Sequence, residues 1–190
     1  MAESNASLVT AAKPGVRGGV SFAAPTGTAL PTDVATVLDA AFVKHGYISE
    51  DGLTDTEDIS SDDIAAFGGD TVLTVVTSRK HTFALTFIQS LDPDVQKEVY
   101  GQENVEVDAV TGLTMIRRNG KTMPRRVFVF ELLLTGNKVK RIVVPEGQVT
   151  ERGDVVYSDG EPVGYEVTIT AYPSTDFDGD TAREYLGELA

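Results

Sequence analysis

The stretch RRVFVFELLLTGNKVKRIVVP, residues 125–145 of this 190-residue chain, indicates the class of fold. Residues 127–134 are apolar on both faces of a strand, which predicts a strand packed between two layers rather than a half-exposed one. Thr135, Gly136 and Asn137 follow directly and are typical of a hairpin turn. The sequence therefore predicts an antiparallel hairpin, with its first strand inside a layered β domain.

The segment VGYEVTITAY, residues 163–172, alternates apolar and polar residues. This alternation predicts one face in the core and one polar face directed outward. The polar face is formed by Glu166, Thr168 and Thr170. Strands are also predicted between residues 104 and 157, on both sides of the central hairpin.

Upstream of these strands, residues 71–78 and 81–89 are also typical of β-strands. Arg79 and Lys80 lie between them, which predicts a turn at these two residues. The result is a mainly β fold with paired neighbouring strands, and an antiparallel β-sandwich or barrel accommodates all of them.

One helix is predicted at residues 92–101. Asp92 is a good N-cap, Pro93 suits the first helical position and Gly101 is placed to end the helix. Val95 and Val99 lie four residues apart and would pack against a sheet. A second short helix is predicted to begin at residue 32 or 33 and to end at residue 46, because its apolar residues recur at helical spacing.

Charge is sorted along the chain. Residues 46–70 contain eight acids and no Lys or Arg, whereas residues 117–141 contain eight bases and one acid. The last 45 residues contain eleven acids and two Arg. A subunit that meets a copy of itself in one orientation benefits from opposite patches on different faces, which favours self-assembly. The alternative is a solvated acidic face and an unrelated basic hairpin.

The expected organisation is one β-sandwich domain at residues 31–173 between two extensions. Residues 1–30 form an arm rich in small residues, with a strand candidate at 16–24, and residues 174–190 form a C-terminal tail. Both extensions have little to pack against on their own domain and are expected to reach neighbouring subunits. Within the domain, residues 49–63 form a long acidic loop, either extended or folded as a polar hairpin.

Composition argues against several function classes. A net charge of −13 disfavours a protein that grips nucleic acid by neutralising phosphates. The chain has two His and no Cys, and it carries none of the motifs of acyl transfer or nucleotide chemistry. No apolar run approaches the roughly 20 residues of a membrane span. We therefore expect no catalytic residue, no cofactor, no metal and no membrane.

Two longer stretches carry a family resemblance. They are GTALPTDVATVLDAAFVKHGYISEDGL at residues 27–53, followed by Gly68-Gly69, and VVYSDGEPVGYEVTITAYP at residues 155–173. With the paired strands and the helix between them, they resemble the major tail proteins, or tail tube proteins, of long-tailed phages, particularly those that infect actinobacteria. The similarity covers roughly residues 16–173, in the order found in the family.

The resemblance implies a structural virion protein and not an enzyme. Such proteins have a β-sandwich or barrel with a flanking helix, form six-membered rings and stack them head to tail around a tape-measure protein. Tail-tip and tail-terminator proteins are further partners, and DNA passes through the lumen in transit. The implied location is the virion tail, assembled in the host cytoplasm, and no cofactor is used.

Within this framework the charged segments are candidate ring-stacking surfaces, since head-to-tail contact joins two different patches of one subunit. The candidate residues are Glu50, Asp51, Asp55, Glu57, Asp58, Asp62, Asp63, Arg117, Arg118, Lys121, Arg125 and Arg126. The polar face of Glu166, Thr168 and Thr170 is a candidate lumen lining, with outer solvent exposure as the alternative. Two other functions stay open: a β-sandwich binding module on a virion surface, and an inner-tube ring protein of a contractile injection system.

Overall fold

A single antiparallel sheet contains nine of the strands in the computed structural model, which describes residues 4–15 and 19–188. Its strand order is β3-β2-β8-β9-β10-β5-β4, with β1 on β8 and β11 on β9, and β6 and β7 form a small separate sheet. The elements are η1 (Ala6–Leu8), β1 (Ala12–Pro14), β2 (Ser21–Pro25), β3 (Val43–Lys44), β4 (Ile48–Ala65), β5 (Thr71–Phe87), α1 (Pro93–Tyr100), η2 (Gln102–Asn104), β6 (Val105–Val107), β7 (Thr114–Ile116), β8 (Arg126–Leu134), β9 (Lys138–Arg152), β10 (Tyr165–Ala171), η3 (Thr175–Phe177) and β11 (Arg183–Glu188). The predicted fold class, mainly β with one short α-helix, is confirmed among the described residues.

Strand β8 lies between two apolar cores, as the sequence predicts. Phe128 and Phe130 belong to the larger core, together with Phe83 of β5 and the buried face of α1. Val129, on the opposite face of β8, belongs to a second core with Phe22. The first six residues of β8 are all buried, which explains why this strand carries no alternation of polar and apolar residues.

The sheet folds over because β9 changes partners along its length. Its first part pairs with β11 and its last part with β10, while β8 runs along its other edge. The change falls at Pro145-Glu146-Gly147, where the β8–β9 register shifts. Proline offers no N–H to the ladder, and a bulge bends a strand. A Cβ on Gly147 would lie 2.5 Å from the Phe128 ring, so the bend admits only glycine without repacking.

Helix α1 forms as predicted. The Asp92 side chain accepts a hydrogen bond from the Asp94 backbone N–H, Pro93 is the first helical residue and Gly101 follows the last. Val95 and Val99 are buried in the larger core, at 0% and 2% exposure. The helix therefore closes one end of the folded sheet.

The second predicted helix, at residues 32–46, is wrong, since the segment is an irregular loop over the second core up to residue 42 and then the short strand β3. The Asp33 carboxylate accepts hydrogen bonds from the backbone N–H groups of Ala35 and Thr36, at 2.8 and 2.5 Å, and from the Thr36 hydroxyl at 2.7 Å. Buried Arg141 donates to the carbonyls of Asp33 and Thr36 at 2.6 and 2.8 Å. The Asp33 carbonyl thus accepts a hydrogen bond from Arg141 instead of from a backbone N–H group in the first turn of a helix.

The predicted turn at Arg79 and Lys80 is also wrong, because β5 continues through both residues. They pair with Ile59 and Asp58 of β4 in one long hairpin. The turn lies instead at residues 66–70, where Gly68 and Gly69 have φ values of 116° and 100°. Neither form expected for residues 49–63 is found: the segment is most of a single long strand, β4, which pairs with β5.

The chain ends take part in the sheet. β2 pairs with β8 and is buried over its first four residues, and β1 pairs with the far end of β8. β11 pairs with β9 along six residues, and Phe177 is buried in the second core. The expectation that residues 174–190 pack poorly on their own domain is therefore wrong for residues 174–188. Parts of the expected arm and tail, and of the strand candidate at 16–24, lie outside the described residues.

Arg141→Met should destabilise the domain by about 3–5 kcal/mol, because it leaves Glu131 buried without its cation. Arg141 and Glu131 are almost fully buried and lie 2.6 Å apart. The measurement is the free energy of unfolding by urea denaturation. Arg141→Met/Glu131→Met, which removes both charges, should recover part of the loss. A loss below about 1 kcal/mol in the single variant would show that the buried pair is not important for stability.

Thr36→Val should raise the pKa of the Asp33 carboxyl group. That pKa is lowered mainly by the hydrogen bond from the Thr36 hydroxyl, with a further contribution from the Thr36 N–H. A lowered carboxyl pKa contributes stability above the unfolded-state pKa, and that contribution is lost as the pH falls through the folded-state pKa. NMR titration of the Asp33 carboxyl carbon measures the shift. Thr28→Val is the control, since that hydroxyl bonds the Pro25 carbonyl and should leave Asp33 unchanged.

Candidate assembly surfaces

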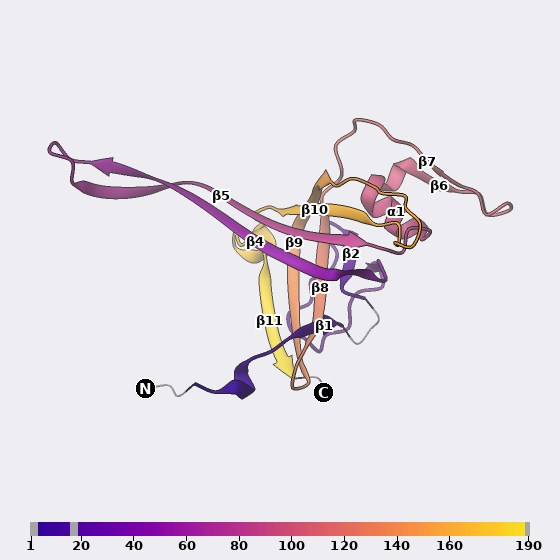
Figure 1. Cartoon of the computed structure of the whole chain (residues 1–190), viewed down its shortest axis with the longest axis horizontal. Coiled ribbons are helices and arrows are strands. Elements are labelled where there is room, and N and C mark those ends of the chain that lie inside the picture. Colours follow the sequence, from indigo (N-terminus) through magenta and orange to yellow (C-terminus); the bar gives the residue numbers. More distant parts are fainter. Residues whose placement is uncertain (1–3, 16–18, 189–190) are drawn as a thin grey trace.

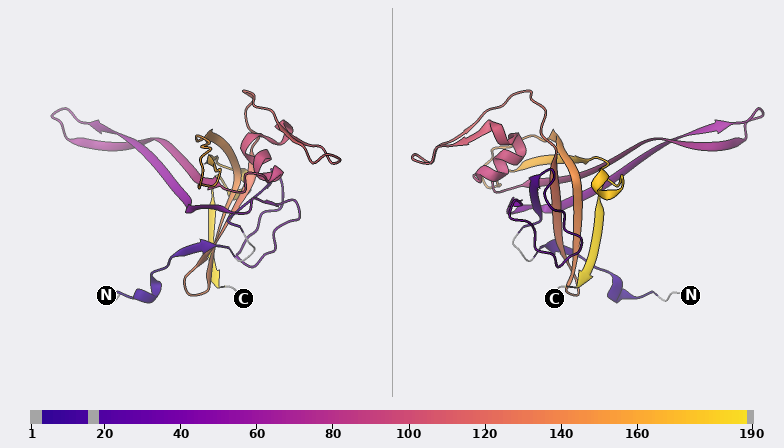
Figure 2. Two further views of the ribbon diagram at one scale, coloured as in Figure 1. Left: turned by 45° about the vertical axis from the view of Figure 1, so that its right-hand side comes forward. Right: turned by 180° about the vertical axis from the view of Figure 1, so that it is seen from behind.

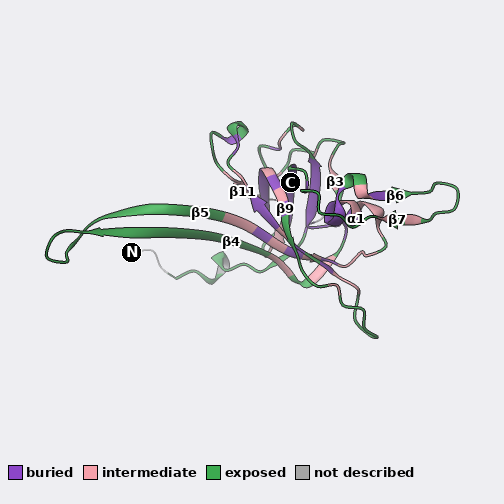
Figure 3. Cartoon of the chain, turned by 90° about the horizontal axis from the view of Figure 1, so that it is seen from above, coloured by how far each residue is buried: buried purple, intermediate pink, exposed green. Residues whose placement is uncertain are grey.

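The outer parts of β4 and β5 form a projecting arm, which we define as residues 54–80 and call the hairpin arm. Every residue in this range is exposed. The arm leaves the body on one side and extends well beyond it in all views (Figures 1 and 2). Seen from above, its ribbon is exposed along the whole outer length, whereas the part of β5 over the body is buried or intermediate (Figure 3).

The hairpin arm presents apolar side chains on both faces. Cross-strand partners share a face and residues alternate along a strand. Ile64 pairs with Leu73 and Asp62 with Val75, which places the three apolar residues on one face. Ile59 and Val76 fall on the other face, and all five are between 43% and 56% exposed. An isolated two-stranded hairpin is marginally stable in water, so the arm is a surface suited to cover by a partner.

The seven predicted acidic residues all lie on β4, but they do not form one patch. Asp55, Glu57 and Asp63 alternate onto one face, and Asp58 and Asp62 onto the other. Asp55 contacts Nε2 of His81 at 2.8 Å, and Asp63 accepts a hydrogen bond from the Thr74 hydroxyl at 2.6 Å. Glu50 and Asp51 lie near the start of β4, at the base of the hairpin. The acidic charge therefore surrounds the arm.

Four of the five predicted basic residues lie in the segment that connects β7 to β8, and the fifth, Arg126, is the first residue of β8. Most of them already have acidic partners. Arg117 lies 2.6 Å from Glu106, Lys121 3.7 Å from Glu103 and Arg125 2.6 Å from Glu146. These pairs are partly or largely exposed, so each contributes only about 0–1 kcal/mol and leaves the cation accessible. The sequence did not reveal these pairs, since the acids are scattered between residues 103 and 146.

Arg118 and Arg126 behave differently from the other bases. Arg118 donates a hydrogen bond to the Tyr100 hydroxyl at 3.0 Å and lies over the same ring. Arg126 is buried and lies 2.9 Å from the buried Glu98 of α1, which also lies 3.5 Å from His45. The ion pair between Arg126 and Glu98 therefore links β8 to α1, and Arg126 contributes no charge to the surface. The start of the β7–β8 segment lies on the α1 side of the body, away from the hairpin arm (Figure 1), whereas the Arg125 guanidinium lies 4.1 Å from the centre of the Tyr172 ring.

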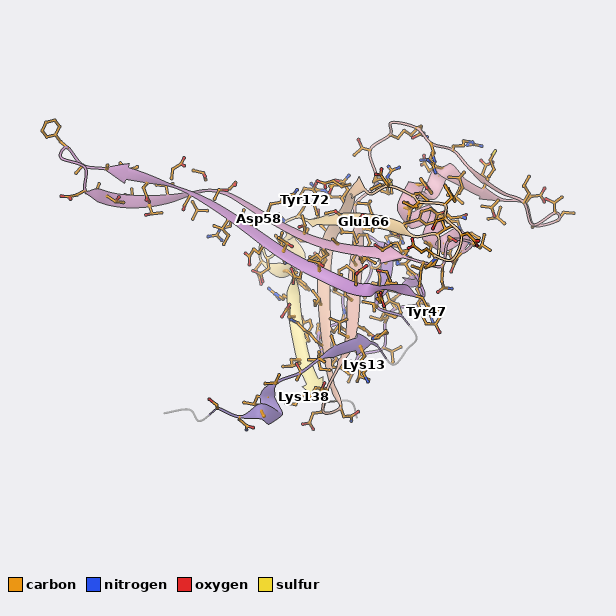
Figure 4. All side chains as sticks on the ribbon, in the orientation of Figure 1. Lys13, Tyr47, Asp58, Lys138, Glu166 and Tyr172 are labelled. Atoms are coloured by element: carbon orange, nitrogen blue, oxygen red, sulfur yellow. The ribbon has the colours of Figure 1, made fainter. Side chains whose placement is uncertain are left out.

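The polar face of β10 matches its predicted alternation. Val167 and Ile169 are in the larger core, while Glu166 is exposed and Thr168 is half-buried on the opposite face. Thr170 is only 9% exposed, and its hydroxyl lies 2.8 Å from that of Thr150. Glu166 and Thr168 of β10 pair with Thr86 and Ala84 of the neighbouring strand β5, so the same face of the sheet continues onto β5. Figure 4 shows Glu166 over the body and away from the hairpin arm.

No site for small-molecule chemistry stands out in the part of the chain that the structure describes. Within it, no group of three or more acids and imidazoles is placed to hold a metal ion, and no helix is long and apolar enough to span a membrane. Asp178 and Asp180, in the acidic run DFDGD at residues 176–180, both contact Arg183 at about 3 Å. A binding pocket needs aromatic side chains that converge, but Tyr165 and Tyr172 line different hollows. Burial raises the pKa of the Tyr165 hydroxyl.

The folded sheet, its flanking helix and the exposed hairpin arm define a β-sandwich subunit with a projecting arm. The chain belongs to the phage tail tube protein family, whose model matches residues 1–184. It therefore has a structural role in a phage tail tube, in the tail of the virion.

One similar chain comes from a structure titled "Virion of native gene transfer agent (GTA) particle"; it is 11% identical, covers 80% of this chain and 92% of its own length, and has a TM-score of 0.39. No curated protein matches the chain.

Replacing residues 61–77 by Asn-Gly should leave the body folded. Ser60 and Ser78 pair directly, so a two-residue turn can close the shortened hairpin. None of the removed residues belongs to either core. The free energy of unfolding should change by less than about 1 kcal/mol, as for other surface changes. Loss of a cooperative unfolding transition would show that the hairpin arm stabilises the body.

Proposed function

We propose that this protein assembles into six-membered rings that stack head to tail into the tail tube of a long-tailed phage, and that the tube delivers DNA into the host. The hairpin arm is the observation that carries this proposal. It holds apolar and acidic side chains away from the body, where only another molecule can cover them. Family membership supports the tube, and the arm supports contact between copies.

The contact between copies is proposed to be heterologous, because the hairpin arm and the basic β7–β8 segment are different surfaces of one subunit. Acids surround the arm, and Arg117, Lys121 and Arg125 lie partly exposed in the β7–β8 segment. Exposed ion pairs contribute little energy, so charge would set orientation while apolar burial on the arm gives affinity. Arg126 takes no part in this surface, since it is buried.

The polar face that contains Glu166 and Thr168 is the proposed lumen lining. A wall with excess negative charge repels the phosphates of DNA, so that the genome passes without being held. The net charge of −13 and the exposure of Glu166 are compatible with this role. Thr170 would contribute to packing beside the lining and not to its surface.

The proposal includes further partners and a domain plan. The tube would assemble around a tape-measure protein and end at tail-tip and tail-terminator proteins, with assembly in the host cytoplasm. Residues 31–173 would form the tube domain. The ends, residues 1–30 and 174–190, would contribute contacts to neighbouring subunits in addition to their strands in the sheet.

Negative-stain electron microscopy of the purified protein over a concentration series tests this function. We expect rings or hollow tubes above a threshold concentration. Exposed charges are screened within roughly 3 Å at 1 M salt, compared with about 10 Å at 0.1 M, so the threshold should rise at high salt. Monomers at every concentration, with and without an added tail-tip and tape-measure complex, would contradict the proposal.

Reversing charge on the arm separates specific contacts from net charge. Asp58→Lys/Asp62→Lys should raise the threshold concentration for tubes, because both residues project from the same face of the arm. Asp39→Lys/Glu188→Lys reverses two exposed acids outside the arm and is the matched control. Equal effects of the two variants would show that net charge alone governs assembly.

A further inference from the structure

A groove of about 690 Å³ opens where β5 leaves the body, beside the turn that follows β10. One wall carries Arg79, Lys80 and His81 of β5, and the other carries Tyr172, Pro173 and Ala182. The volume is in the range that encloses a drug-sized molecule, or a few side chains of a peptide loop. The groove therefore has one wall with two cations, Arg79 and Lys80, and one wall of mixed polarity, in which the Tyr172 ring also contacts Arg125 at 4.1 Å.

The cations of this groove have weak intramolecular partners. Arg79 forms no ion pair with another described residue, and Lys80 has only an exposed contact of 3.6 Å with Glu151. Two acids also line the groove: Asp180, which is held by Arg183 at 2.9 Å, and Glu57. The side chains of Arg79 and Lys80 are thus available to an acidic partner.

The loop between β9 and β10, residues 153–164, has the complementary chemistry. It contains Asp154, Asp159 and Glu161 and no Lys or Arg, and none of these acids pairs with a cation among the described residues. Its centre exposes Val156 at 61% and Tyr157 at 73%. An exposed Tyr within an acidic loop is a typical anchor for a protein interface.

The loop and the groove lie at opposite ends of β10 (Tyr165–Ala171). In Figure 1 the orange loop after β9 lies beside α1, whereas Tyr172 in Figure 4 lies where the hairpin arm leaves the body. The length of β10 separates them, which places the loop to meet the groove of another molecule. The complementary partner present in every solution of the protein is a second copy of the same chain.

We propose that the β9–β10 loop of one subunit docks into the β5 groove of the next, with Tyr157 against Tyr172 and Pro173 and the loop acids facing Arg79 and Lys80. This contact is heterologous: each copy uses its loop at one end of β10 and its groove at the other, and repetition gives a closed ring or an open helix. The inference rests on the proposed function and adds the lateral contact between subunits of one ring.

Engineered disulfides test the contact directly, because the chain has no native Cys. We choose Tyr157→Cys/Ala182→Cys, which places one thiol in the loop and one in the groove. Protein assembled under the conditions that give rings or tubes is oxidised and analysed by denaturing electrophoresis without reductant. The double variant should give a ladder of covalent oligomers, whereas each single Cys variant should give no species beyond a dimer.

The matched control is Tyr157→Cys/Lys138→Cys, since Lys138 lies at the β8–β9 turn, far from Tyr172 (Figure 4). A ladder from the loop–groove pair and not from the control pair supports the contact. Rings or tubes without that ladder would overturn the contact and leave the tail tube function standing. Absence of any assembly would overturn both.

Charge exchange gives a second readout that needs no crosslink. Arg79→Glu/Lys80→Glu and Asp159→Lys/Glu161→Lys should each raise the threshold concentration for assembly at least about tenfold, since like charges would face each other. A variant with all four changes should have a threshold concentration within about threefold of that of the unmodified protein, because the charges of loop and groove are again complementary. If the variant with all four changes had a threshold concentration raised by the product of the two separate effects, the proposed contact would be contradicted.

Discussion

Burial of β8 on both faces is the constraint on which the rest of the structure depends. A strand with apolar side chains on both sides needs a layer on each side, and this chain supplies both from one continuous sheet. β9 makes this possible because it bends at Pro145-Glu146-Gly147 and changes partners from β11 to β10. The larger core then forms between β8 and β5, and α1 closes it.

The second core needs a different cover, and an irregular loop provides it. Residues 30–42 lie over Val129 and Val143, held by Arg141 through two backbone carbonyls and by the Asp33 turn. Because both cores are complete without the hairpin arm, the arm is free to present its side chains outward. The body can thus be stable while its most exposed element is kept for contact with other molecules, which is what a tube subunit requires.

Much of the fold follows from local sequence patterns. The β8–β9 hairpin, the capped helix α1 and the alternation of β10 were all predictable, because burial, capping and turn geometry act over a few residues. The helix at residues 32–46 was not correctly predicted, since a side chain more than 100 residues away captures its carbonyl groups. The false turn at Arg79-Lys80 has a similar origin, as pairing with β4 carries β5 past two charged residues.

The candidate surfaces could be predicted only in part. The sequence showed which segments are acidic and basic, and all seven acids do project from one strand of the hairpin. It could not show that Arg126 is buried against Glu98, or that an acidic loop and a groove with two cations lie at opposite ends of β10. These relations depend on the path of the whole sheet, which places residues distant in sequence side by side.

Hydrogen exchange of the backbone amides of β4 and β5, measured before and after assembly, tests directly whether another subunit covers the hairpin arm. We predict fast exchange in the outer parts of both strands in the monomer, slow exchange in the buried strand β8 in both states, and strong protection of residues 54–80 on assembly. Equal exchange of the hairpin arm in the monomer and in the assembled state would contradict the claim that another subunit covers it.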